Sequence, residues 1–341
     1  MNLLTDFKKR FGYLRTFRKK GIAHVNLQIL YQCNFSCKIC NFWKSDFKDK
    51  PRMTVEAARK VSDQLATMGP TLISIGGGEP LLHRDLIEIC QILSKNNFVV
   101  MICNGWFMTR EKARAIWEAG LYEVSISVDY ASAEKHDANR GMPGAYDRAL
   151  NALRILYEER VHPYQRVHMI SVVMDDNLAD IEPLIQKSRS MGITYLVTFY
   201  SDARGVKTRR NPAPEVSAHL LELKMRYPEF VSPRGYLERY AQAATEQGIV
   251  PCRAGRNLMN IDCTGEVSPC IDHLDQSCGN ILKDDMAGIK KNLFDFSCHN
   301  TCGGCWTSCR GPIETMMYGD KRLKNIWDFK RMTQDVPLFK A

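Results

Sequence analysis

Three cysteines fall within eight positions near the start of the chain. Cys33, Cys37 and Cys40 have the spacing C-x3-C-x2-C in the stretch QCNFSCKICNFW. A structural zinc site needs four ligands and a disulfide needs two, so three thiols match neither. Each could instead bind one iron of a cubane [4Fe–4S] cluster, which leaves the fourth iron open to an exogenous ligand. An open metal position is typical of a catalytic centre, and the alternative is a zinc site completed by a distant ligand.

A second group of cysteines lies toward the C-terminus, between residues 252 and 309. It comprises Cys252, Cys263, Cys270, Cys278, Cys298, Cys302, Cys305 and Cys309. Disulfides are rare in a reducing compartment, so clustered thiols there indicate bound metal. Metal binding would also help to fold this segment, which has few regular patterns. The alternative for the whole region is a structural zinc ribbon.

Composition and charge restrict the class of protein. The chain has 341 residues, 45% of them hydrophobic, and a net charge of +9. It has no apolar h-region of a secretory signal and no apolar run of the roughly 20 residues that a spanning helix needs. We therefore expect a cytoplasmic protein with at most peripheral membrane contact. The basic run Arg204–Arg210 lacks interleaved aromatic residues, which favours a solvated loop over an RNA site, and we expect no DNA partner.

Short β-rich runs alternate with amphipathic stretches over residues 24–200. This alternation predicts βαβ units around a parallel sheet, either doubly wound or a partial (β/α) barrel. In both folds the functional groups gather at the C-terminal ends of the strands, and the first cysteine group directly follows the first strand. The predicted strands are 24–31, 71–75, 98–103, 122–128, 166–173 and 195–200. The predicted helices are 54–68, 85–96, 109–119, 144–159 and 178–190, followed by short helical patterns near 214–225 and 234–247.

Three motifs in order make the chain similar to the radical S-adenosylmethionine (SAM) superfamily. The cysteine triad follows the first strand, GGGEPLL (76–82) follows the second, and SISVD (125–129) ends the fourth. The segment EKHDANRG (134–141) also resembles the loop that the family has after that strand. One departure is Ile39, because the family usually has an aromatic residue before the third cysteine. The resemblance implies a partial (β/α)6 TIM-type barrel with a smaller cysteine-rich C-terminal domain.

The same resemblance implies roles for individual residues. Cys33, Cys37 and Cys40 would hold a catalytic [4Fe–4S] cluster whose open iron binds SAM. The backbone of Gly77 and Gly78 and the carboxylate of Glu79 would hold the SAM ammonium. The remaining contacts, to the methionine part or the ribose of SAM, would come from Asn104, Ser127 and Asp129.

The second cysteine group resembles the SPASM and twitch domains that accompany some members of the superfamily. The spacing Cys252-x12-Gly265-x4-Cys270 matches the opening of those domains, and Cys302-x2-Cys305 lies at the far end. This likeness implies one auxiliary [4Fe–4S] cluster. Its expected ligands are Cys252, Cys270, Cys302 and Cys305, with Cys309 or Cys298 as substitutes. Two auxiliary clusters are the alternative.

The predicted organisation has three parts. Residues 1–23 form a basic amphipathic segment that either covers one end of the barrel or lies on anionic lipid. Residues 24–212 form the barrel, and residues 213–341 form a helical linker and the auxiliary cluster domain.

The expected reaction begins with removal of a hydrogen atom from the substrate by a 5′-deoxyadenosyl radical. Oxidation or bond formation would follow, on a small molecule, a lipid or a peptide, with flavodoxin or ferredoxin as electron donor. A maturase of ribosomal peptides is the alternative, made less favoured by the short segment before the first strand. The alternative from another class is a non-catalytic iron–sulfur or zinc protein that binds RNA, which would leave GGGEP and SISVD unexplained.

Overall fold

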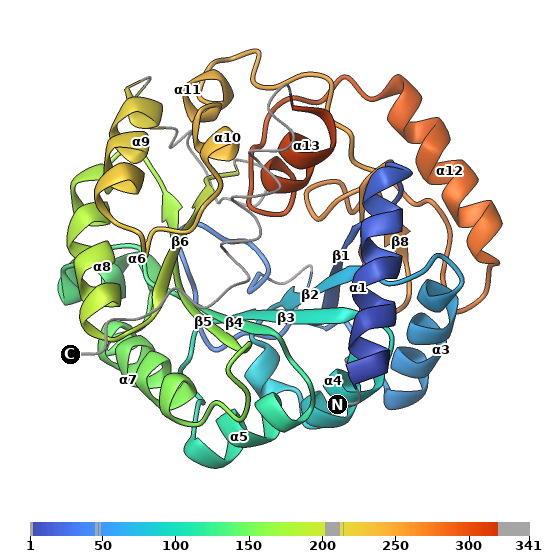
Figure 1. Ribbon diagram of the computed structural model, residues 1–341, viewed down its shortest axis with the longest axis horizontal. Helices are drawn as coiled ribbons and strands as arrows, with labels where there is room; N and C mark the ends of the chain where they lie inside the picture. Colours follow the sequence, from blue (N-terminus) through green and yellow to red (C-terminus); the bar gives the residue numbers. More distant parts are fainter. Residues whose placement is uncertain (1–2, 45–46, 48, 202–211, 214, 320–341) are drawn as a thin grey trace.

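A single curved sheet organises the computed structural model (Figure 1), which describes residues 3–44, 47, 49–201, 212–213 and 215–319. The order of its strands is β6-β5-β4-β3-β2-β1-β7-β8. The six predicted strands are confirmed, and they are parallel to one another. Their bounds are β1 His24–Leu30, β2 Leu72–Gly77, β3 Phe98–Cys103, β4 Glu123–Ser127, β5 Arg166–Val173 and β6 Thr194–Phe199. The basic run Arg204–Arg210, which the sequence predicts to be a solvated loop, lies outside the described residues.

Helices surround the outer face of this sheet (Figure 1). The five predicted between strands are confirmed as α3 Val55–Ala66, α4 Leu86–Ser94, α5 Arg110–Glu118, α7 Ala145–Glu158 and α8 Leu178–Ser190. Two of them begin at threonine caps, since Thr54 accepts from the backbone of Ala57 and Thr109 from that of Lys112. Such caps satisfy amides that the first helical turn leaves without partners. Further helices follow β6: α9 Val216–Arg226 and two single-turn helices, α10 Arg234–Leu237 and α11 Tyr240–Ala243.

The two faces of β1 differ in character, which fixes where the site can form. Val25, Leu27 and Ile29 belong to the main hydrophobic core. Asn26 and Gln28 alternate with them and line an internal cavity. Successive side chains of a strand point to opposite faces, so the sheet presents apolar residues to one side and amides to the other.

Two segments differ from the predictions. Residues 134–141, expected as a loop, form α6 (Ala133–Arg140) because the Ser132 side chain caps its first turn and Gly141, with φ +63°, ends it. The cysteine-rich segment contains four further elements. They are β7 Leu258–Ile261, β8 Val267–Ser268, α12 Met286–His299 and α13 Gly311–Tyr318. β7 pairs in parallel with β1, and β8 pairs antiparallel with β7, so this segment extends the sheet of the barrel.

The N-terminal helix α1 (Leu3–Arg18) packs against the end of the barrel opposite to the cysteines. The ammonium of Lys9 is buried and donates to the carbonyls of Ser94 (2.9 Å) and Asn97 (3.3 Å), just before β3 begins. The ring of Tyr13 meets that of Phe98, the first residue of β3. α1 therefore covers this end of the barrel. No helix in the described part of the chain is long and apolar enough to cross a membrane.

Candidate active site

The loop after β1 carries the first cysteine group and is held by its own aromatic residues. The indole Nε1 of Trp43 donates to the carbonyls of Cys37 (3.1 Å) and Cys40 (2.8 Å). The backbone N–H of Phe35 donates to the Cys33 sulfur at 3.4 Å. These contacts fold the loop so that all three thiols line one cavity, which we term the first cavity.

Ile39 takes the place that an aromatic residue usually has in this loop. It packs in the same apolar cluster as Cys33, Cys37 and Cys40, together with Phe35. A bulky aliphatic side chain therefore shields the thiols at this position.

The glycines of GGGEP form a strap along another wall of the first cavity. A Cβ on Gly77 would overlap the carbonyl oxygen of Leu30, and one on Gly78 would overlap that of Gln32. Gly77 also has φ +113°, which an L side chain rarely adopts. Only glycine lets this strap lie directly against the end of β1 and the start of the cysteine loop.

Glu79 is buried at the end of this strap. One carboxylate oxygen accepts from the backbone of Leu81 (3.1 Å) and the other from the backbone of Asn104 (2.8 Å). Burial raises the pKa of Glu79 to about 7. A carboxylate has about four acceptor sites, so two accepted bonds leave it able to bind a cationic group in the first cavity.

Asn104 and Ser127 also line the first cavity. The Asn104 amide donates to Asn34 in the cysteine loop (3.0 Å), and its oxygen accepts from the backbone of Trp106 (2.9 Å). It thus joins the end of β3 to the cysteine loop. Ser127 is the last residue of β4 and lies in the cavity wall.

Asp129 does not line the first cavity, although the motif suggested a contact with SAM. It is fully buried, and its Oδ2 atom pairs with Arg140 (2.7 Å) and accepts from Asn139 (3.0 Å). Its Oδ1 atom accepts from the backbone of Val172 at 3.0 Å. Asp129 therefore holds the guanidinium of Arg140, which does line the cavity and whose positive charge lowers the pKa of the Cys37 thiol against the effect of burial.

The groups of the first cavity match what a [4Fe–4S] cluster and SAM require. Burial raises the pKa of Cys33 to about 12 and that of Cys37 to about 11, so the bare thiols are protonated at neutral pH. Iron binds thiolates, and its charge would favour their ionised form. Glu79 offers a carboxylate for an ammonium, and Arg140 offers a guanidinium for a carboxylate.

The second cysteine group lines a neighbouring cavity, which we term the second cavity. Its walls include the four predicted ligands Cys252, Cys270, Cys302 and Cys305. The backbone of Cys252 donates to the carbonyl of Cys302 (3.0 Å), which joins the two ends of the segment. Burial raises the pKa of Cys252 to about 11, and the guanidinium of Arg310 opposes this rise.

Arg310 and Cys309 also line the second cavity. The sequence predicts Cys309 only as a substitute ligand and predicts no role for Arg310. Arg310 is buried and donates to Glu314 (2.9 Å) and to the carbonyl of Cys305 (2.7 Å). By contrast, Cys298 is exposed on α12 and lines neither cavity. Cys263 and Cys278 are buried in the sheet extension, away from both cavities.

Among the described residues, no three His, Cys, Asp or Glu side chains lie within reach of a single metal ion. Each thiolate of a cubane cluster binds a different iron, so its ligands need not converge on one point.

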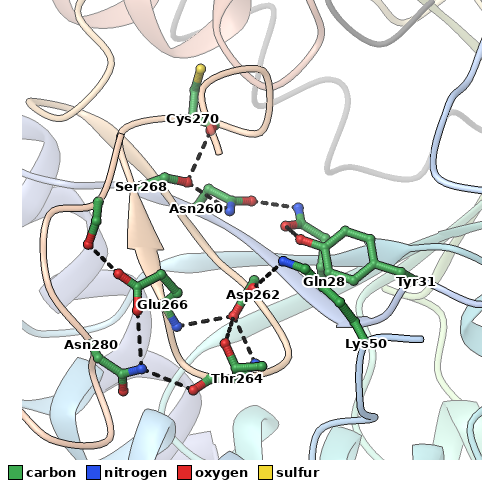
Figure 2. A network of polar contacts seen from close by, with 11 residues as sticks. Gln28, Tyr31, Lys50, Asn260, Asp262, Thr264, Glu266, Ser268, Cys270 and Asn280 are labelled. Carbon is green, nitrogen blue, oxygen red and sulfur yellow. Dashed lines mark hydrogen bonds and ion pairs between the residues drawn. The ribbon is translucent and has the colours of Figure 1, made fainter. Parts of the chain in front are cut away.

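A buried polar chain connects the two cavities (Figure 2). Gln28, in the wall of the first cavity, donates to Asn260 at 2.5 Å, and Asn260 donates to Ser268 at 3.0 Å. Ser268 donates to the carbonyl of Cys270 at 3.2 Å, in the wall of the second cavity. These hydrogen bonds fix the β7–β8 hairpin, and with it Cys270, relative to β1.

Comparisons with known proteins bear on the identity of the chain. Residues 27–187 match the model of the radical SAM superfamily. The chain is 27% identical to an AdoMet-dependent heme synthase of Methanosarcina barkeri over 76% of its length and 79% of the relative. It is also 27% identical to the mycofactocin maturase MftC of Mycobacterium tuberculosis, over 83% of this chain and 76% of the relative. This chain is a radical SAM enzyme.

The fold of this radical SAM enzyme also matches a solved structure. The crystal structure of SuiB of Streptococcus suis bound to precursor peptide SuiA gives a TM-score of 0.63 at 16% identity, covering 85% of this chain and 70% of that one. The expected partial barrel is therefore confirmed. Members of the superfamily use a [4Fe–4S] cluster and SAM, and these are the cofactors of this radical SAM enzyme as well.

Sequence reasoning also missed Arg140 and Asn26 in the walls of the radical SAM enzyme's cavities. Arg140 falls in the segment expected to be a loop, and an isolated arginine has no distinctive spacing. Asn26 lies within the first strand, where a polar residue among Val25, Leu27 and Ile29 was the available signal. Its alternation with apolar residues places it toward the barrel interior.

Proposed function

We propose that this radical SAM enzyme removes a hydrogen atom from a substrate in the first cavity and then passes one electron of the substrate radical to a second [4Fe–4S] cluster in the second cavity. The observation that supports this is that the two cysteine-lined cavities adjoin and share wall residues. When bound, the first cluster and SAM supply the 5′-deoxyadenosyl radical. An acceptor for the electron in the adjoining cavity would make the overall reaction an oxidation.

The roles of the chain's own residues follow from their chemistry. Cys33, Cys37 and Cys40 would hold the first cluster, and Cys252, Cys270, Cys302 and Cys305 the second. In the wall of the first cavity, Glu79 would accept the SAM ammonium and Arg140 would pair with the SAM carboxylate, as charge-assisted hydrogen bonds. Asp129 would act through Arg140, and the strap of Gly77 and Gly78 would let SAM approach the backbone. Asn104 and Ser127 would contact the remainder of SAM.

The test is anaerobic reconstitution with iron and sulfide, addition of SAM and dithionite, and measurement of 5′-deoxyadenosine. A variant with Cys33, Cys37 and Cys40 all changed to Ala should produce none while keeping the iron of the second cluster. A variant with Cys252, Cys270, Cys302 and Cys305 changed to Ala should still bind one cluster at the triad. Cleavage of SAM by the triad variant would contradict the assignment of the first cluster.

Peptide modification is the second candidate function, supported by the relatives named as maturases and by the fold shared with SuiB, whose structure contains a precursor peptide. The relatives named as heme synthases support a tetrapyrrole instead. Incubation with Fe-coproporphyrin III and, separately, with a panel of synthetic peptides would distinguish them. The true class should raise 5′-deoxyadenosine production above the substrate-free rate and change mass in step with it. Flavodoxin or ferredoxin is the proposed electron donor, and either should replace dithionite.

A further inference from the structure

The two cavities meet at a shared wall. Five residues line both of them: Asn26, Ser201, Ile271, Thr307 and Cys309. Cys309 is the one thiol among these five, and the second cavity already offers four other cysteines for a four-iron cluster. A fifth thiol therefore faces both the cavity proposed for SAM and the cavity proposed for the auxiliary cluster.

The position of Cys309 is fixed by its neighbours in sequence. The backbone N–H of Ser308 donates to the Thr198 hydroxyl at the end of β6, at 3.0 Å. On the other side, the buried guanidinium of Arg310 donates to Glu314 at 2.9 Å and to the carbonyl of Ile249 at 2.5 Å. Cys309 is thus set between two anchored residues at the junction.

A second observation indicates that the junction accommodates a ligand. Asn26 is 5% exposed, and among the described residues its Nδ2 atom has no hydrogen-bond partner. A buried donor without a partner costs about 1–3 kcal/mol, so such groups are usually satisfied by a ligand or water. Because Asn26 lines both cavities, this amide can donate to an oxygen of a molecule that lies beside Cys309.

We propose that Cys309 is a protective hydrogen-atom donor that quenches carbon radicals stranded in the first cavity when oxidation does not follow. The S–H bond breaks and a C–H bond forms, so the carbon radical becomes a closed-shell product and sulfur becomes a thiyl radical. The thiyl radical then takes one electron and one proton and returns to the thiol. The electron comes from the reduced [4Fe–4S] cluster proposed for the second cavity, and the proton comes from water.

The chemistry and the placement favour this role over that of a spare ligand. An S–H bond is weaker than the C–H bond of a methyl group, so transfer from the thiol to a carbon radical is downhill. A donor for this purpose must meet the radical on one side and a one-electron reductant on the other. Cys309 has that placement, whereas Cys298 on α12 lines neither cavity.

The test needs no substrate. The reconstituted enzyme is freed of small thiols, transferred to D2O, and supplied with SAM and dithionite, and the 5′-deoxyadenosine formed is analysed by mass spectrometry. A thiol exchanges its hydrogen with solvent, whereas carbon-bound hydrogens of the protein do not. We expect one deuterium in the 5′-deoxyadenosine from the wild type, and loss of this deuterium in Cys309→Ser and Cys309→Ala. Cys298→Ser is the matched control and should behave as the wild type.

The iron content of the same samples decides whether Cys309 is a ligand. We expect Cys309→Ala to keep the iron content of the wild type. Loss of a cluster from this variant, equal deuterium in variant and wild type, or undeuterated product from the wild type would each overturn the proposal. The inference rests on the proposed function, and the two fail differently. Absence of any 5′-deoxyadenosine from the wild type would overturn both, whereas formation of undeuterated product would overturn the role of Cys309 alone.

Discussion

The two cysteine groups are supported by the fold in opposite ways. Cys33, Cys37 and Cys40 lie on one loop, which packs through Phe35 against Trp106 and through Trp43 onto its own carbonyls. The predicted ligands of the second cavity come from three separate stretches of chain, and the apolar cluster around them has only Cys252, Ala254 and Leu258 as its buried members. The barrel can therefore present its loop without a cluster, whereas we expect the proposed second cluster to add to the hydrogen bonds that hold the C-terminal stretches together.

The largest expected effect is the difference in stability between removing the second cluster and removing the first. Cys252→Ser combined with Cys302→Ser should remove the second cluster and cost several kcal/mol of local stability, because metal binding is folding free energy for such a segment. Hydrogen exchange should then rise across residues 250–310 and stay low in β1 to β6. The counterpart is Cys33→Ser combined with Cys37→Ser, which should leave exchange in both regions near that of the wild type. A general rise in hydrogen exchange in the Cys33→Ser/Cys37→Ser variant would contradict the proposed difference between the two regions.

The buried polar chain offers a way to weaken the link between the two regions. Asn260→Leu removes the partner of the Gln28 amide and one partner of the Ser268 hydroxyl. Leaving a buried polar group unpaired costs about 1–3 kcal/mol, so this change should lower the free energy of unfolding by about 2–4 kcal/mol. Urea denaturation of the reconstituted protein measures it. The control is Asn151→Leu, at an exposed site on α7. An equal loss of unfolding free energy in this control would refute the importance of the buried hydrogen bonds through Asn260.

The carboxylate of Glu79 should make the stability of the barrel depend on pH. Burial raises its pKa from 4.5 to about 7, so between these values the native state keeps a proton that the unfolded state has released. Stability should therefore fall as pH rises toward about 7 and level off above it, by up to about 3 kcal/mol at 1.36 kcal/mol per unit. Glu79→Gln should remove this fall when the free energy of unfolding is compared at pH 5.5 and pH 8. An unchanged slope in the variant would assign the effect to another group.

The smallest expected effect on stability comes from adding a side chain to the glycine strap. A Cβ at position 78 would overlap the carbonyl oxygens of Gln32 and Tyr31, so Gly78→Ala must move the start of the cysteine loop. Overpacking of this kind costs about 1–3 kcal/mol. Gly288→Ala on α12, where a Cβ would meet only ordinary contacts, should change stability little. Thermal unfolding compares the two, and titration with SAM should show weaker binding only in Gly78→Ala.

The barrel could be predicted from the sequence because its signals are local. Each strand is a short β-rich run, each helix has its own amphipathic pattern, and Thr54 and Thr109 mark helix starts. Cys33, Cys37 and Cys40 share one loop, so their spacing alone places them together. The four predicted ligands in the second cavity were chosen from the resemblance, since nothing in their spacing determines how distant segments meet.

The rest depends on tertiary contacts that no local pattern carries. The carboxylate of Asp129 looked available in the sequence, but its partners come from α6 and β5, which cover it completely. The pairing of β7 with β1 could not be inferred, because a four-residue strand far along the chain has too few residues to show a pattern. The position of Cys309 at the junction likewise depends on contacts with β6 and with Glu314.

The pairing of β1 with β7 has a consequence during synthesis. His24 of β1 is opposite Leu258 of β7. The edge of β1 that pairs with β7 therefore stays unpaired while more than two hundred residues are translated. At about 5–20 residues per second, this interval is about 12–47 s. An unpaired strand edge is a template for unwanted pairing with other chains. The nascent barrel is therefore exposed to aggregation until its cysteine-rich segment leaves the ribosome, and truncation before residue 258 would make that exposure permanent.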